Sequence, residues 1–466
     1  MKFITSDFLL YNTTGRGLYH EVAAMLPIVD FHNHIDPAIV ATNRQFGTIQ
    51  EVWVAGDPYK HRAMRICGVS ERLITGDAPD FDKFVAWAKC VKKTVGNPLF
   101  HWSAMELRTI FGIEEILDES NAAAIWEKAN GLLAQEDFTA QAMLQKFNVE
   151  MLCTSDDLAD SLEYHQVFAA QKAGFQCLPS LRGDSIVAFG QASFWPWLEK
   201  IERQTEVKIT NLDSYKKALV TRLDFFKKCG CLLADHSFDS GFSYRQTDER
   251  EAGILFEKIL NKEVLEAEAL IKLQSHVLCF LGKQYAKRDW RMQLHIGAFR
   301  FTSSVLRDKV GGAGGFAAIG HTADIASLSR FLDDLDKEES LPKTILYTLN
   351  PADNAAFASL TGSFSQDGVA GKIQFGPAWW YNDHYQGITD QIKTLASYGL
   401  LSTAIGMTTD SRSIFSMTRH DCYRRILCNL VGEWVETGQL PQDEKLLQGL
   451  IGDISYNNTK SWLSNE

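Results

Sequence analysis

The sequence predicts an α/β protein in which eight parallel strands close into a (β/α)8 TIM-like barrel with helical insertions. Three observations favour this fold class: eight short apolar runs, helical periodicity between most of them, and two long helix-rich connections. Strands buried on both faces are short continuous apolar runs, and their alternation with helices is typical of a parallel sheet. A doubly wound open sheet is the main alternative, but no G-x-G-x-x-G pattern follows the first run.

The predicted strands are distributed along the whole chain. They cover residues 28–31, 151–154, 176–181, 231–234, 292–296, 345–349, 372–375 and 402–407. The connections at about 36–148 and 238–290 are too long for simple crossovers, so we expect helical insertions within one barrel domain spanning 1–466. Because barrel active sites lie at the carboxyl ends of the strands, such insertions would form walls or lids of the site.

The composition is that of an ordinary globular protein, with 45% hydrophobic and 23% charged residues among 466. A net charge of -11 leaves no basic footprint, so we expect neither nucleic acid nor a membrane surface as a partner. Nine cysteines without a C-x-x-C pattern predict reduced thiols. With no secretory signal and no membrane-spanning stretch, we expect a cytoplasmic protein, and a homo-oligomer is compatible with these features.

The end of the first predicted strand carries the strongest local signal. Residues i and i+2 of a strand point to the same face, so His32 and His34 would both face the barrel interior. Neutral imidazole is a common ligand of zinc and similar metals. Two unligated polar residues at a strand end are the alternative interpretation.

Asp410 follows the eighth predicted strand, which in a closed barrel lies beside the first. Two imidazoles and one carboxylate, with open positions for water or substrate, form a catalytic rather than a structural ligand set. The sequence therefore predicts one divalent metal ion held by His32, His34 and Asp410, with a helix N-cap as the alternative role of Asp410. No lysine that could bridge two metals ends the fourth run, so a single ion is favoured.

Other polar side chains follow the predicted strands. His295, on the fifth, is a further ligand, an acid–base group or a satisfied core histidine. Arg182 and Arg412, after the third and eighth strands, could each clamp a carboxylate through paired hydrogen bonds, and surface ion pairs are the alternative.

Aromatic residues supply further candidates for substrate binding. Tyr59, in the first insertion, could donate to a substrate oxygen. Trp379 and Trp380 follow the seventh strand and could pack on the C–H face of a sugar, although ordinary packing is the commoner use. Near the C-terminus we interpret four basic residues as a solvated helix face: Arg419, His420, Arg424 and Arg425.

Short motifs occur in order from one end of the chain to the other. They lie at residues 7–10, 32–34, 56–65, 96–102, 154–157, 295–298, 349–354, 379–380, 409–413 and 419–420. With these motifs the chain resembles the uronate isomerase (glucuronate isomerase) family, an outlying branch of the amidohydrolase superfamily.

The resemblance implies a (β/α)8 barrel with one metal, usually zinc, at His32, His34 and Asp410. It places four more residues at the substrate: Tyr59, Arg182, His295 and Arg412. The implied reactions convert D-glucuronate to D-fructuronate and D-galacturonate to D-tagaturonate in hexuronate catabolism. The C2 base stays open among Asp410, His295 and Tyr59.

The chain departs from the family pattern at three places near the expected site. Pro58 stands where many members have histidine, Gly183 replaces a common proline, and residues 301–303 replace an Asn-rich stretch. These changes bear on substrate preference and turnover and leave the metal set intact. The alternatives to an isomerase are a mononuclear metal-dependent hydrolase and a sugar-acid binder without catalytic activity.

Overall fold

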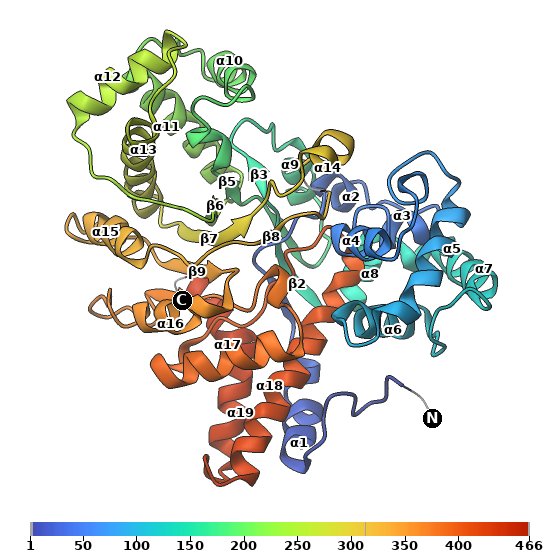
Figure 1. Ribbon diagram of the computed structural model, residues 1–466. Helices are drawn as coiled ribbons and strands as arrows, with labels where there is room; N and C mark the ends of the chain where they lie inside the picture. Colours follow the sequence, from blue (N-terminus) through green and yellow to red (C-terminus); the bar gives the residue numbers. More distant parts are fainter. Residues whose placement is uncertain (1–2, 313, 465–466) are drawn as a thin grey trace.

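The computed structural model describes residues 3–312 and 314–464, in which helices surround a mostly parallel sheet (Figure 1). Each of the first seven predicted strands overlaps an observed strand, and the third is divided between two. The observed strands are β1 (Ile28–Asp30), β2 (Val149–Cys153), β3 (Asp156–Asp157), β4 (Gln176–Leu178), β5 (Leu181–Arg182), β6 (Leu233–Asp239), β7 (Arg291–Phe299), β8 (Ala318–Ile319), β9 (Thr344–Thr348) and β10 (Ile373–Phe375).

The strands follow one another across the sheet in chain order. The ladder β1-β2-β4 and the ladder β3-β5-β6-β7-β9-β10 are parallel throughout, and β8 is antiparallel to β7. The amide of Thr154 donates to Leu178 O at 3.0 Å and that of Asp156 to Ser180 O at 2.9 Å. Because these bonds bridge the two ladders, β3 continues β2 and β5 continues β4.

The eighth predicted strand, residues 402–407, is not a strand in the structure. A 3-10 turn occupies Leu401–Thr403, and the residues that follow run without a backbone ladder. Side-chain hydrogen bonds hold this segment and residues 408–409 instead, as when Gln374 Nε2 donates to Thr403 O at 2.9 Å. The carboxylate of Asp30 accepts from the amide of Thr409 at 2.7 Å, and Thr408 Oγ1 accepts from the amide of residue 32 at 2.8 Å. Apolar runs do not reveal this kind of pairing, so the sequence prediction was wrong here.

The segment after this turn nevertheless lies against the end of β1. The amide of Asp410 donates to His32 O at 3.0 Å, and the amide of His34 donates to Ser411 O at 2.9 Å. The segment that carries Asp410 therefore lies beside the end of β1, next to the two predicted histidine ligands.

Helices fill the two long connections and the shorter ones. Between β1 and β2 lie α2 (Pro37–Ala41), α3 (Ile49–Trp53), α4 (Pro58–Ile66), α5 (Asp80–Val91), α6 (Pro98–Phe111), α7 (Ala122–Leu133) and α8 (Ala140–Lys146). Between β3 and β7 lie α9 (Glu163–Ala169), α10 (Phe194–Thr205), α11 (Leu212–Lys228), α12 (Glu249–Leu260) and α13 (Ala267–Lys287). The later connections hold α14 (Ser304–Val310), α15 (Ile325–Asp336), α16 (Asn354–Leu360) and α17 (Tyr385–Tyr398).

The two ends of the chain pack together. Figure 1 shows α1 (Thr13–Glu21) beside α18 (Thr418–Glu436) and α19 (Glu444–Gly452), and α20 (Asn458–Ser464) ends the described chain. Across residues 3–312 and 314–464, no helix combines the length and the apolar character needed to cross a bilayer.

The four basic residues predicted as a solvated face of α18 are buried, so this interpretation was wrong. Their exposed fractions are 2% for Arg419, 4% for His420, 5% for Arg424 and 7% for Arg425. Each bonds or pairs with a residue of another segment, as when Arg424 donates to Leu26 O at 2.7 Å. Partners so distant in sequence are invisible to a local charge pattern.

Candidate active site

One cavity of about 310 Å³ collects the residues that the sequence predicts for the site. All nine line it: His32, His34, Tyr59, Arg182, His295, Trp379, Trp380, Asp410 and Arg412. Sequence reasoning missed three polar members of the lining, Asp235, Ser237 and Arg300. Asp235 directly follows the fourth predicted strand, and that position is the signal that could have found it. Ser237 lies within β6 and Arg300 directly follows β7, both beyond the predicted strands.

His32, His34 and Asp410 bring three ligand atoms together. Asp410 Oδ1 lies 3.0 Å from His34 Nε2 and 3.4 Å from His32 Nε2, and the three residues form a group whose ligand atoms all lie within 4.8 Å of one another. Ligands about 2.0–2.1 Å from a tetrahedral zinc ion lie roughly 3.3 Å apart. The donor set therefore fits one divalent ion in spacing and in chemistry.

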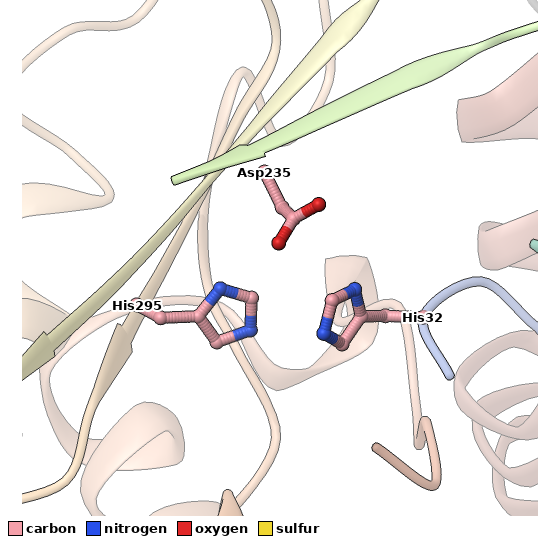
Figure 2. A group of neighbouring side chains, drawn as sticks. All are labelled: His32, Asp235 and His295. Carbon is pink, nitrogen blue, oxygen red and sulfur yellow. The ribbon is translucent and has the colours of Figure 1, made fainter. Parts of the chain in front are cut away.

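A second group shares His32. The ligand atoms of His32, Asp235 and His295 also lie within 4.8 Å of one another. Figure 2 shows the carboxylate of Asp235 directed toward the space between the two imidazole rings, whose centroids are 4.6 Å apart. His32 Nδ1 and His295 Nε2 are buried and have no hydrogen-bond partner within the described part of the chain. His32 is thus common to both groups.

The backbone at Asp410 aims its carboxylate. Its φ of 48° lies in the left-handed region, which is uncommon for a residue other than glycine and concentrates at functional sites. Trp379 Nε1 donates to Asp410 Oδ2 at 2.8 Å. Since that oxygen is occupied, Oδ1 is the one directed at the two histidines.

The protonation states in the cavity follow from burial and neighbouring charge. Burial raises the pKa of Asp410, but the hydrogen bonds with His32 and His34 lower it by more. The pKa therefore lies well below its usual value. Burial and the neighbouring His32 hold the pKa of His295 well below 6.5. Burial raises the pKa of Tyr59 well above 10, so that its hydroxyl keeps its proton.

Helix capping places Tyr59 at the cavity. Asp57 caps α4 by accepting from the amides of Tyr59 at 2.8 Å and Lys60 at 3.1 Å. Pro58 occupies the first position of the helix, where no amide proton is needed. The departure from the family at this position therefore fits the local helix geometry.

Gly183 makes room for a neighbouring side chain. A Cβ atom at this position would lie only 2.2 Å from His236 Cε1. His236 in turn bonds the hydroxyl of Tyr285 at 2.9 Å. Gly183, where the family commonly has proline, therefore leaves the space that the His236 ring fills.

Three arginines line the same cavity and are more accessible; we call Arg182, Arg300 and Arg412 the arginine rim. Arg182 Nε donates to Asp184 Oδ2 at 2.9 Å, and its side chain is 39% exposed. Arg300 Nε donates to Asp239 Oδ1 at 3.0 Å, and its guanidinium carbon lies 5.4 Å from the centroid of the Trp380 ring. Arg412 is exposed.

The fold and the site define an α/β protein with a candidate single-metal centre where the strands of a parallel sheet end. The family model described as glucuronate isomerase matches residues 1–463. The chain belongs to this family, which confirms the resemblance predicted from the motifs.

The similarity to relatives and to a solved structure extends over nearly the whole chain. The uronate isomerase of Caldanaerobacter subterraneus subsp. tengcongensis is 45% identical over 463 residues, 99% of each chain. That of Bacillus licheniformis is 46% identical over 465 residues, 100% of this chain and 98% of its own. The crystal structure of uronate isomerase from Thermotoga maritima matches with a TM-score of 0.94 and 32% identity, covering 99% of this chain and 100% of that one.

A solved hydrolase is more distant. The putative metal-dependent hydrolase from Lactobacillus casei has a TM-score of 0.53 and 13% identity, covering 96% of this chain and 97% of that one. A likeness at this level extends to the fold alone. The family model and the relatives named uronate isomerase favour neither the hydrolase nor the inactive binder considered from the sequence.

Proposed function

We propose that this chain is a uronate isomerase that converts D-glucuronate to D-fructuronate and D-galacturonate to D-tagaturonate. The observation that carries the proposal is the joint presence of a His-His-Asp group and three arginines in one cavity. A volume of about 310 Å³ is in the range of roughly 300–1,000 Å³ of small-ligand sites. Family membership supports the same reaction.

The barrel belongs to the same proposal. The sheet closes into a (β/α)8 barrel in a single domain, 1–466, with helical insertions at about 36–148 and 238–290. Support comes from one apolar cluster that joins residues of β1, β2, β6, β7 and β9 to Ile405, beyond the last strand. Barrel interiors are filled by such layers. Nine free cysteines support a reducing, cytoplasmic location.

His32, His34 and Asp410 would hold the divalent ion, with zinc as its expected identity. The bound ion supplies a Lewis acid next to an oxygen of the sugar. Asp235 and His295, which form the second group with His32, are further polar neighbours of the ion site.

The arginine rim binds the carboxylate of the uronate. Arg182 and Arg412 present planar guanidinium groups, which pair with a carboxylate through two hydrogen bonds. Trp379 and Trp380 supply aromatic surface beside them for the C–H face of the sugar.

The reaction moves a proton between adjacent carbons through an enediol, so it needs a base at C2 and a donor for the developing oxyanion. Tyr59 keeps its proton and serves as the donor. Asp410 and His295 are both unprotonated and line the same cavity, so these two are the candidates for the base.

Incubation with D-glucuronate and D-galacturonate in heavy water tests the proposal. We expect ketose formation from at least one of them and deuterium at C2 of the aldose formed in the reverse reaction. The H295N variant separates the two candidate bases: loss of the exchange at C2 with the metal still bound assigns the base to His295, and retained exchange leaves Asp410. Hydrolysis of sugar lactones without any isomerisation of uronates would overturn the proposal in favour of the hydrolase.

A further inference from the structure

Arg419 is a buried arginine just behind the cavity. It lies in the first turn of α18, and its side chain is 1% exposed. Its guanidinium carbon lies 3.9 Å from the centroid of the Trp102 ring and 5.1 Å from that of the Tyr59 ring. Arg419 does not line the cavity itself, so any effect on the reaction must pass through residues that do.

The same guanidinium reaches two further segments. Nη1 donates to Thr409 O at 3.1 Å and to Asp383 Oδ2 at 3.4 Å. Thr409 directly precedes Asp410, and Asp383 directly follows the turn Trp380–Asn382. One side chain therefore contacts the three segments that supply Tyr59, Trp380 and Asp410 to the site.

Buried charges surround this contact. Lys60 Nζ lies 2.5 Å from Asp57 Oδ2 and 3.8 Å from Glu106 Oε2, and all three side chains are buried. Asp57 is the residue that caps α4 next to Tyr59. Removing one member of a buried, hydrogen-bonded charge network leaves its partners uncompensated, so the remaining groups must move or change protonation.

We propose that Arg419 is a positioning residue of the isomerase, which holds the ring of Tyr59 and the backbone of Asp410 in fixed relation to each other. The phenol donor and the carboxylate must act on one substrate, so a small displacement of either has a large kinetic effect. A misplacement of about 1 Å can lower a rate about 100-fold. The kinetic part of this inference rests on the proposed function.

Two variants of Arg419 and one matched control test the inference. R419K keeps the charge but loses the planar group that contacts three segments, whereas R419M loses both. The control is R425K on the same helix, because Arg425 is also buried but donates to the N-terminal segment, at 2.6 Å to Ser6 O and 2.7 Å to the hydroxyl of Tyr19.

We expect kcat to fall about tenfold in R419K and about 100-fold in R419M, with KM within threefold, because the arginine rim is untouched. Zinc titration of the metal-free proteins should show about tenfold weaker binding in R419M, since Asp410 is then held less firmly. In R425K both kcat and zinc affinity should stay within twofold of the wild type, whatever its melting temperature.

Unchanged kcat and zinc affinity in folded R419K would overturn the inference, as would an equal loss in R425K. If R419M yields no folded protein, R419K decides. If the wild-type protein isomerises no uronate, the proposed function fails, and zinc affinity in the same variants decides whether Arg419 positions Asp410.

Discussion

The two sides of the cavity differ in how firmly the fold holds them. On the metal side, His32 is 2% exposed and Asp410 17%, and each is fixed by contacts with distant segments. On the arginine rim, the Arg182 side chain is 39% exposed and bonds a carboxylate only two residues away. The difference indicates that the reacting groups are set by the fold, whereas the groups that bind the carboxylate can adapt to their ligand.

The largest effect is expected from Asp410→Asn on the metal side. The change removes the charge that pairs with both histidines, so we expect kcat to fall by about three decades or more with the fold intact. A ketose assay with either uronate and a circular dichroism spectrum are the measurements. Turnover near the wild-type rate would refute the assignment of Asp410.

A smaller effect is expected on the free energy of unfolding in acid. It should come from a buried histidine and not from the arginine rim. His165 is buried and bonds Thr154 Oγ1 at 2.8 Å, and burial lowers its pKa to about 4. Since an unfolded histidine titrates near 6.5, the unfolded chain binds the extra proton first. Stability from this group is full above pH 6.5 and is lost as the pH falls toward 4, by about 3 kcal/mol at most.

Urea unfolding of metal-free wild type and His165→Gln at pH 7.5 and 4.5 measures this contribution. The variant should lose less free energy of unfolding between the two pH values than the wild type. The neighbouring Asp156, whose pKa burial raises to about 7, is present in both proteins and opposes the trend. Equal losses in the two proteins would show that His165 does not contribute.

Arg182→Met tests the rim with an expected loss of about 2 kcal/mol in uronate binding, the size of a charge-assisted hydrogen bond. KM should rise about 30-fold while kcat changes by less than threefold. The matched control is Arg203→Met, at an exposed position near the end of α10. A fall in kcat without a change in KM would place Arg182 with the reacting groups instead.

The smallest effect is expected from Phe301→Ala, where the chain departs from the family. The ring lines the cavity but is 53% exposed. Its loss should alter the free energy of unfolding by less than about 0.5 kcal/mol and KM by less than threefold. Steady-state kinetics and chemical unfolding measure both, and a tenfold rise in KM would assign the ring to substrate binding.

Sequence reasoning succeeded for the candidate metal ligands. His32, His34 and Asp410 were predicted to meet, and their ligand atoms lie within 4.8 Å of one another because the segment of Asp410 is hydrogen-bonded to the end of β1. Apolar runs found seven strand positions, since burial on both faces is a local property of the sequence.

The failures have a common physical cause. The segment at 402–407 accepts hydrogen bonds from the distant side chains of Gln374 and Asn458, and Arg419 finds its partners 10 and 36 residues away. Both depend on polar contacts between distant segments, which leave no periodic pattern. Asp235 was overlooked because one carboxylate after a strand is common, and its meaning comes from the two histidines that face it.

Anomalous diffraction from crystals of the zinc-loaded protein tests the central claim most directly. We expect one ion about 2.0–2.2 Å from His32 Nε2, His34 Nε2 and Asp410 Oδ1. An ion held by His32, Asp235 and His295, with the Asp410 carboxylate turned away, would contradict it.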